Sequence, residues 1–147
     1  MDQANSTQVA GTHYQTEYQT WDFIHDMKLG YFEGNVVKYV QRHPKKAGLT
    51  DLAKALHYTQ KTRELYGHGR LPQHMVAEAS RKGAAKSMPA FIDAAYRTIE
   101  KFCSVNAVLR PEASVIHAIS TWRTSRDLER IESDIQDLMN QYQLPLA

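Results

Sequence analysis

The stretch that decides the fold is Glu-Gly-Asn-Val-Val-Lys-Tyr-Val-Gln-Arg-His-Pro, residues 33–44. At about 100° per residue, Val36, Val37 and Val40 share one face of a helix. The opposite face carries polar and aromatic side chains, namely Asn35, Lys38, Tyr39 and Arg42. The valine face predicts burial in a core, and Pro44 predicts that the helix ends just before it.

Helical patterns recur along the rest of the chain. We expect helices over 21–28, 33–43, 51–66, 88–106, 111–121 and 126–142. Thr20, Thr50 and Ser125 are the expected N-caps of three of them. No stretch alternates between apolar and polar residues for long enough to indicate a strand, so the sequence predicts an all-α bundle of about six helices.

A degenerate repeat runs through this pattern. Glu33-Gly-Asn-Val-Val37 is similar to Glu112-Ala-Ser-Val-Ile116, and each segment is followed by a break and an Asp-Leu pair that opens a long helix. The two pairs are Asp51–Leu52 and Asp127–Leu128, and the aromatic residues Phe23 and Phe102 precede the two units. The pattern favours two helix–break–helix units that pack against each other. A chance similarity is the alternative.

Composition limits the class of protein. The chain has 147 residues, of which 42% are hydrophobic and 23% charged, so it can form one globular domain without a metal or a disulfide. Its formal net charge of +2 excludes a histone-like polycation, and its single cysteine, Cys103, cannot form an intramolecular disulfide. No apolar run approaches the ~18–20 residues of a membrane span, so we expect no membrane partner.

Four regions follow from the distribution of residues. We assign 1–12 to a flexible polar tail, 13–66 to a motif region, 67–87 to a connector rich in glycine and small residues, and 88–147 to a helical region packed on the first half.

The motif region concentrates positive charge. Lys38, Arg42, Lys45 and Lys46 lie within one helix and the turn after it, and Lys54 and Tyr58 lie on one face of the next helix. Crowded cations repel one another unless an anion lies among them, and a di- or triphosphate is such an anion. A solvated basic face is the alternative interpretation.

Aromatic side chains stand just before this cluster. His13, Tyr14 and Trp21 lie upstream of the basic helix, and nucleobases stack on such rings. Trp21 could instead simply anchor the first helix in the core. Cys103 lies in an apolar helical segment, where a packed thiol is the better interpretation than a nucleophile.

Together these motifs resemble a known family. They are His13-Tyr14-Gln15, Trp21-Asp22-Phe23, Gly34-Asn-Val-Val-Lys-Tyr39, Arg42, Lys45–Lys46 and Asp51-Leu-x-Lys-Ala55 with Tyr58. The segment 11–66 resembles a small family of phage proteins of unknown function whose characterised member is a nucleotide kinase without a phosphate loop of the usual kind. The resemblance implies a nucleoside monophosphate kinase that transfers a phosphoryl group from a nucleoside triphosphate to dTMP or dGMP, in the cytoplasm of an infected bacterium.

The resemblance also implies roles for single residues. Lys38 and Arg42 would hold phosphates at the reacting centre, and Lys45 and Lys46 would close over them. Asn35 and His13 would donate hydrogen bonds, Tyr14 or Trp21 would pack the base, and Tyr39, Lys54 and Tyr58 would complete the substrate site. Asp51 could orient Lys38 or Arg42, hold Mg²⁺, or serve only as a first-turn carboxylate of its helix.

Two other functions use the same basic residues. A nucleic-acid-binding or host-interaction module could lay them along a phosphodiester backbone, although the patch is compact and the net charge small. A nucleotide hydrolase or sensor could bind the same ligands without transfer to an acceptor. A cluster on two short helices leaves the site open in a monomer, so we also expect a homo-oligomer.

Overall fold

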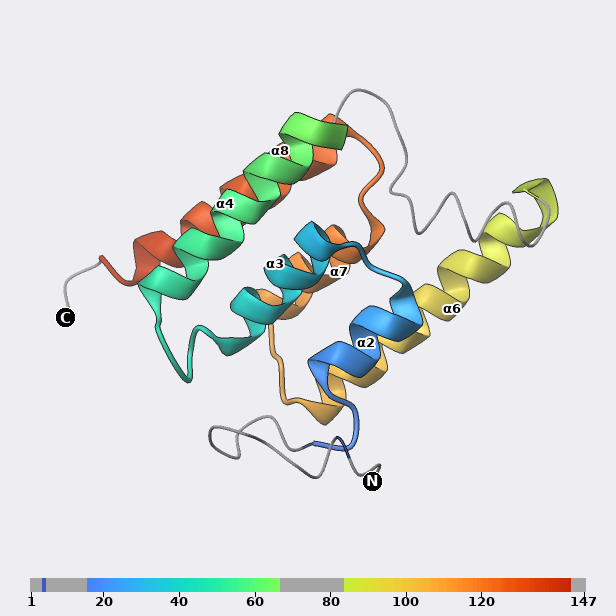
Figure 1. Ribbon diagram of the computed structural model, residues 1–147, viewed down its shortest axis with the longest axis horizontal. Coiled ribbons are helices and arrows are strands. Elements are labelled where there is room, and N and C mark those ends of the chain that lie inside the picture. The colour runs from blue at the N-terminus through green and yellow to red at the C-terminus, as the bar shows by residue number, and fades with distance from the viewer. Residues whose placement is uncertain (1–3, 5–15, 67–83, 144–147) are drawn as a thin grey trace.

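The computed structural model describes residue 4 and residues 16–66 and 84–143. These residues form six helices and no strand, which confirms the predicted all-α fold (Figure 1). The helices are α2 (Thr20–Met27), α3 (Tyr31–Arg42), α4 (Leu49–Tyr66), α6 (Ala84–Val105), α7 (Glu112–Thr121) and α8 (Ser125–Gln141). None of the described helices is both long and apolar enough to cross a membrane.

Each helix of the first half packs against its counterpart in the second half. In Figure 1, α4 lies alongside α8, α3 alongside α7, and α2 alongside α6. Contacts within each half join α3 to α4 and α7 to α8. This is the arrangement expected if two similar units bury their apolar faces against each other.

The ends of α2 and α6 show the repeat at the level of the backbone. Lys28 and Ala107 follow these helices, and both adopt the left-handed conformation with a φ of 54°. The next residue in each case, Leu29 or Val108, donates its N–H to a carbonyl five residues earlier. Both ends therefore form the same helix-terminating turn, as expected if the two halves repeat one another.

Equivalent residues also meet where the halves join. The rings of Phe23 and Phe102 stack with centroids 4.4 Å apart and an interplanar angle of 19°. Both side chains are fully buried. Contact between a residue and its own counterpart indicates an approximate two-fold axis passing between α2 and α6.

The core takes apolar residues from both halves. Val36, Val37 and Val40 are fully buried, as their shared helix face predicts. Their partners include Leu52, Ile99, Val115, Ile116, Ile119, Trp122, Leu128, Ile131, Ile135 and Leu138. Burying one such side chain stabilises the fold by roughly 1.5–3 kcal/mol.

Several expected helix ends were wrong. Gln19, not Thr20, is the N-cap of α2, where its backbone N–H bonds to Asp22. Thr50 lies inside α4, because that helix begins one residue before it, at Leu49. Thr124, not Ser125, caps α8: its hydroxyl accepts a hydrogen bond from the Asp127 N–H.

Two other boundaries also differ from the prediction. Helix α3 begins at Tyr31 rather than at residue 33, with Gly30 as its N-cap. Helix α6 begins at Ala84, so residues 84–87 belong to a helix and not to the expected connector. The rest of that connector, the expected tail at 1–12 and residues 144–147 lie outside the described part of the chain, apart from residue 4.

Candidate nucleotide site between α3 and α4

A buried ion pair fixes the hairpin of α3 and α4. The Arg42 guanidinium donates two hydrogen bonds to Asp51, from Nε at 3.0 Å and from an Nη atom at 2.9 Å. Asp51 is fully buried and also accepts the Ala47 N–H at 3.2 Å. The intervening turn needs a left-handed residue, which Gly48 provides with a φ of 50°. The pair therefore sets the angle between the two helices that carry the site.

This pairing engages the Asp51 carboxylate within the hairpin. Burial raises the pKa of Asp51, but the hydrogen bonds from Arg42 and Ala47 outweigh it and hold the pKa below its ordinary value. Both carboxylate oxygens are engaged, so Asp51 positions Arg42. Among the residues that the structure describes, no three His, Cys, Asp or Glu side chains are grouped so that they could hold a metal ion.

Three cations surround the ring of Tyr39. Lys38 Nζ lies 5.2 Å from the ring centroid, Arg42 Cζ lies 5.0 Å away, and Lys54 Nζ lies 5.4 Å away. At these distances the π-electrons of the ring attract a cation. The structure thus brings two residues of α3 and one of α4 to a single aromatic side chain. Because Asp51 already neutralises Arg42, the charges that favour an anion nearby are those of Lys38 and Lys54.

A cavity of about 330 Å³ adjoins this ring. It is lined by Phe32, Tyr39, Lys54, His57, Tyr58 and Lys61. The four residues from α4 stand at positions i, i+3, i+4 and i+7, so they form one face of that helix. The volume falls in the range of small-molecule pockets, roughly 300–1,000 Å³.

Aromatic rings form one wall of the cavity. Tyr39 stacks on Tyr58 with centroids 6.0 Å apart and an interplanar angle of 16°. Phe32 lies 6.3 Å from Tyr58, and the Tyr31 and Tyr58 hydroxyls are 3.3 Å apart. The hydrogen bond with Tyr31 raises the pKa of Tyr58, so its phenol stays protonated at neutral pH. The wall is largely apolar, its Phe32 and Tyr58 rings are inclined at 53° to each other, and tyrosine hydroxyls lie at its edge.

Other expected site residues lie away from this cavity. Asn35 donates its side-chain amide to the Tyr31 carbonyl at 2.7 Å. Trp21, on α2, is 53% exposed and does not line the cavity. Lys45 and Lys46 are exposed in the turn after α3. His13 and Tyr14 lie outside the described residues.

Phe32 and His57 were absent from the predicted site, and Lys61 was predicted only to share a helix face with Lys54 and Tyr58. Phe32 lies two turns before Tyr39 on the same face of α3. His57 and Lys61 follow Lys54 at i+3 and i+7 on α4. The helical spacing from Lys54 and Tyr58 was a usable signal for these two, whereas Phe32 depends on how α3 packs on α4.

Comparison with known proteins gives a family match over part of the chain and no activity. Residues 9–60 match the sequence model of the DUF3310 family, described as a protein of unknown function. This match supports the resemblance of the N-terminal half to a small family of unknown function. It spans α2, α3 and most of α4, and thus every lining residue of the α3–α4 cavity except Lys61. No curated protein and no solved structure matches the chain.

Proposed function

We propose that the α3–α4 cavity binds a nucleotide and that the protein is a nucleoside monophosphate kinase. The observation that carries the nucleotide assignment is the joining of an aromatic wall to a group of cations in one cavity. A nucleotide has a planar apolar base and a polyanionic end, which match these two features. The choice of phosphoryl transfer as the reaction follows from the resemblance of residues 11–66 to a family with a kinase member.

The geometry favours one orientation of the ligand. The base would lie against Phe32 and Tyr58, where stacking contributes about 1–3 kcal/mol per base in comparable sites. The phosphates would then lie toward Lys54 and Lys61, on the cationic side of the cavity. Lys38 and Arg42 reach the same ring from the neighbouring turns of α3.

Phosphoryl transfer asks little covalent chemistry of the protein. An oxygen of the acceptor phosphate forms a bond to the terminal phosphorus of the donor triphosphate, while the bond from that phosphorus to its bridging oxygen breaks. The protein must align the two nucleotides and neutralise the charge on the transferring oxygens. Lys38 and Lys54 would provide this neutralisation, and any divalent ion would enter with the triphosphate as part of the substrate.

Arg42 needs a different test from the lysines. Replacing it with alanine would leave the Asp51 carboxylate buried without its partner, so lost activity could reflect lost folding. Neither Lys38 nor Lys54 forms a salt bridge with a described acid, and the charge of Lys54 is the last and smallest of the causes that lower the Asp51 pKa. Their glutamine variants therefore test the phosphate role more cleanly.

The decisive experiment incubates the purified chain with dTMP or dGMP and a triphosphate labelled at its terminal phosphate. We expect labelled nucleoside diphosphate, with turnover at least about tenfold lower in Lys54→Gln, because a hydrogen bond to a charged group is worth ~1.5–3 kcal/mol. Arg130→Gln is the matched control, since Arg130 holds the same place in α8 as Lys54 does in α4 and is exposed.

Other products would contradict the kinase assignment. Release of labelled inorganic phosphate without transfer would indicate a hydrolase. A nucleic-acid-binding module would give no product. It would bind a polynucleotide with an affinity that falls steeply as salt is added, and mononucleotides would not displace the polynucleotide.

A further inference from the structure

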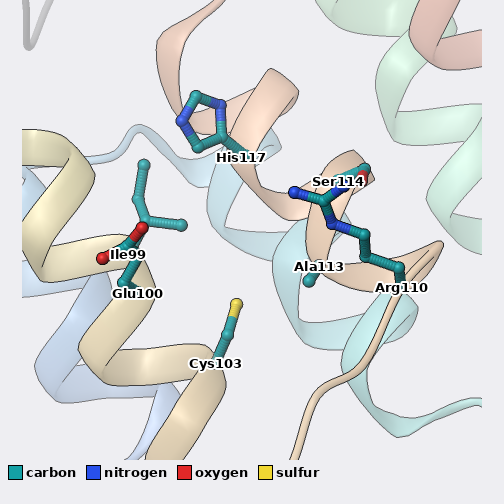
Figure 2. Close-up of a pocket in the computed structure, with 7 residues that line it drawn as sticks. All are labelled: Ile99, Glu100, Cys103, Arg110, Ala113, Ser114 and His117. Atoms are coloured by element: carbon teal, nitrogen blue, oxygen red, sulfur yellow. The ribbon is translucent and has the colours of Figure 1, made fainter.

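A second cavity, of about 440 Å³, lies between α6 and α7. Figure 2 shows Glu100 on the α6 side, Arg110 and Ser114 on the α7 side, and the Cys103 sulfur pointing between them. None of its lining residues belongs to the α3–α4 cavity. The proposed nucleotide function leaves this cavity unexplained.

The repeat explains why a cavity exists here. In the first half, the corresponding groove lies between α2 and α3, and Ile24 fills it: its Cδ1 would stand 3.1 Å from a Cβ on Gly34. The counterpart of Ile24 in the second half is the smaller Cys103, and Trp21 is replaced by Glu100. The second unit therefore has the same backbone turns, but the smaller Cys103 leaves space that Ile24 fills in the first half, although Ala113 replaces Gly34 and Ile99 replaces Thr20.

The walls of the cavity carry complementary polar groups over an apolar floor. Cys103 and Ile99 are buried and form the floor. The Arg110 guanidinium can bind phosphate or carboxylate oxygens through two parallel hydrogen bonds. On the opposite wall, the Glu100 carboxylate accepts hydrogen bonds and repels acceptors. A ligand that satisfies both walls carries an anion at one end and N–H donors at the other.

An aromatic pair stands at one end of the cavity. The His117 ring lies 4.5 Å from the Tyr96 ring, at an interplanar angle of 51°. Burial lowers the pKa of His117, and the charge of Glu100 offsets only part of this effect, so the neutral imidazole predominates at neutral pH. A neutral ring beside an apolar floor suits a planar ligand.

We propose that the α6–α7 cavity is a second ligand site, which takes a planar molecule with an anionic group at Arg110 and an amino group at Glu100. An aminopurine nucleoside monophosphate has this chemistry. Its phosphate pairs with Arg110 and Ser114, its base lies beside His117, and its exocyclic amino group donates to Glu100. This site is separate from the α3–α4 cavity and does not depend on the kinase assignment.

Cys103 allows a direct test, because it is the only cysteine in the chain. Adenosine monophosphate is added to the full-length protein, and the rate of Cys103 alkylation by iodoacetamide is followed by mass spectrometry at a fixed alkaline pH, because burial raises the pKa of this thiol to about 11. At a concentration ten times the dissociation constant we expect a rate about tenfold lower, by mass action. Adenosine and inorganic phosphate, each lacking one half of the ligand, should protect only at far higher concentrations.

Variants and a second readout complete the test. Arg110→Gln should raise the protecting concentration about tenfold or more, whereas Arg97→Gln, an exposed arginine on α6, should not change it. Glu100→Gln should reduce the preference for adenosine over inosine monophosphate, since inosine presents an oxygen where adenosine has its amino group. The His117 imidazole signals, assigned with His117→Gln, should shift with adenosine monophosphate over the same concentrations.

The proposal is overturned if adenosine monophosphate neither slows alkylation nor shifts the His117 signals. Equal protection of the wild type and Arg110→Gln would overturn it too, because binding would then not use the guanidinium.

Discussion

Two buried carboxylates of the first half have pKa values that their surroundings shift in opposite directions. Asp51 receives hydrogen bonds from Arg42 and Ala47, and its pKa is held below its ordinary value. Glu33 is buried at the start of α3, where burial raises its pKa and the nearby N–H groups of Glu33 and Gly30 offset only part of that rise. The indole N–H of Trp122 also lowers the Glu33 pKa, although its geometry falls outside that of a standard hydrogen bond.

Asp51→Asn should destabilise the protein by about 1.5–3 kcal/mol at pH 7, because it removes a charged hydrogen-bonding partner from the partly exposed Arg42 guanidinium. A lowered pKa in the folded state stabilises the fold above the ordinary pKa, and this contribution disappears as the pH falls through the lowered value. Urea unfolding should therefore show a large difference between wild type and variant at pH 7 and a smaller one below about pH 4. A difference that stays constant with pH would contradict this assignment.

Glu33→Gln should show the opposite dependence on pH. A raised pKa means that the folded state binds its proton more tightly, so the wild type gains stability as the pH falls through that raised value. Glutamine removes the cost of a buried charge and keeps an acceptor oxygen beside Gly30, where a Cβ would stand only 2.6 Å from the Glu33 carboxylate. The variant should be as stable as the wild type or more stable at pH 7, measured by urea unfolding, and lose any advantage near pH 4. Clear destabilisation at pH 7 would be the contrary result.

At the scale of single helices, some features were predictable from the sequence and some helix ends were not. The valine face of α3 was predictable because helical periodicity alone fixes which residues share a face. The true cap of α8 was also readable, since Thr124 and Asp127 have the spacing of a capping box, which Ser125 lacks. The start of α3 was not readable, because Tyr31 and Phe32 join that helix through ring contacts with Tyr58 on α4.

Thr124→Ala should cost about 1 kcal/mol of unfolding free energy, the usual worth of an N-cap hydrogen bond. Ser125→Ala should change stability by less than about 0.5 kcal/mol, because that residue already lies within α8. Thermal unfolding of the two variants compares them directly. A larger loss of stability in Ser125→Ala than in Thr124→Ala would indicate that Ser125 is the N-cap.

At the scale of the whole molecule, the two-fold repeat makes the differences between the halves informative. The counterparts of Tyr39, Tyr58 and Lys61 are Ala118, Asp134 and Asp137. The second half therefore cannot build the same aromatic and cationic cavity, although its helices follow the same path. Only the packing of the helices could show that the cavity opens between α3 and α4.

The exposed aromatics lead us to expect a homo-oligomer in solution. Tyr31 is 70% exposed beside the α3–α4 cavity, and Trp21 is 53% exposed on α2. A second copy of the chain that covered them would enclose the cavity and bury apolar surface. Sedimentation equilibrium should give a mass above that of one chain, and Tyr31→Ser should shift it toward the monomer. A monomer at all concentrations would contradict this expectation.

The central claim, that the α3–α4 cavity holds a nucleotide, is tested most directly by calorimetric titration of dTMP into the wild type, Lys54→Gln and Arg130→Gln. We predict that Lys54→Gln weakens binding about tenfold or more, through loss of a charged hydrogen bond to phosphate, and that Arg130→Gln binds as the wild type does. Equal affinity in all three proteins, or no binding by any of them, would contradict the claim.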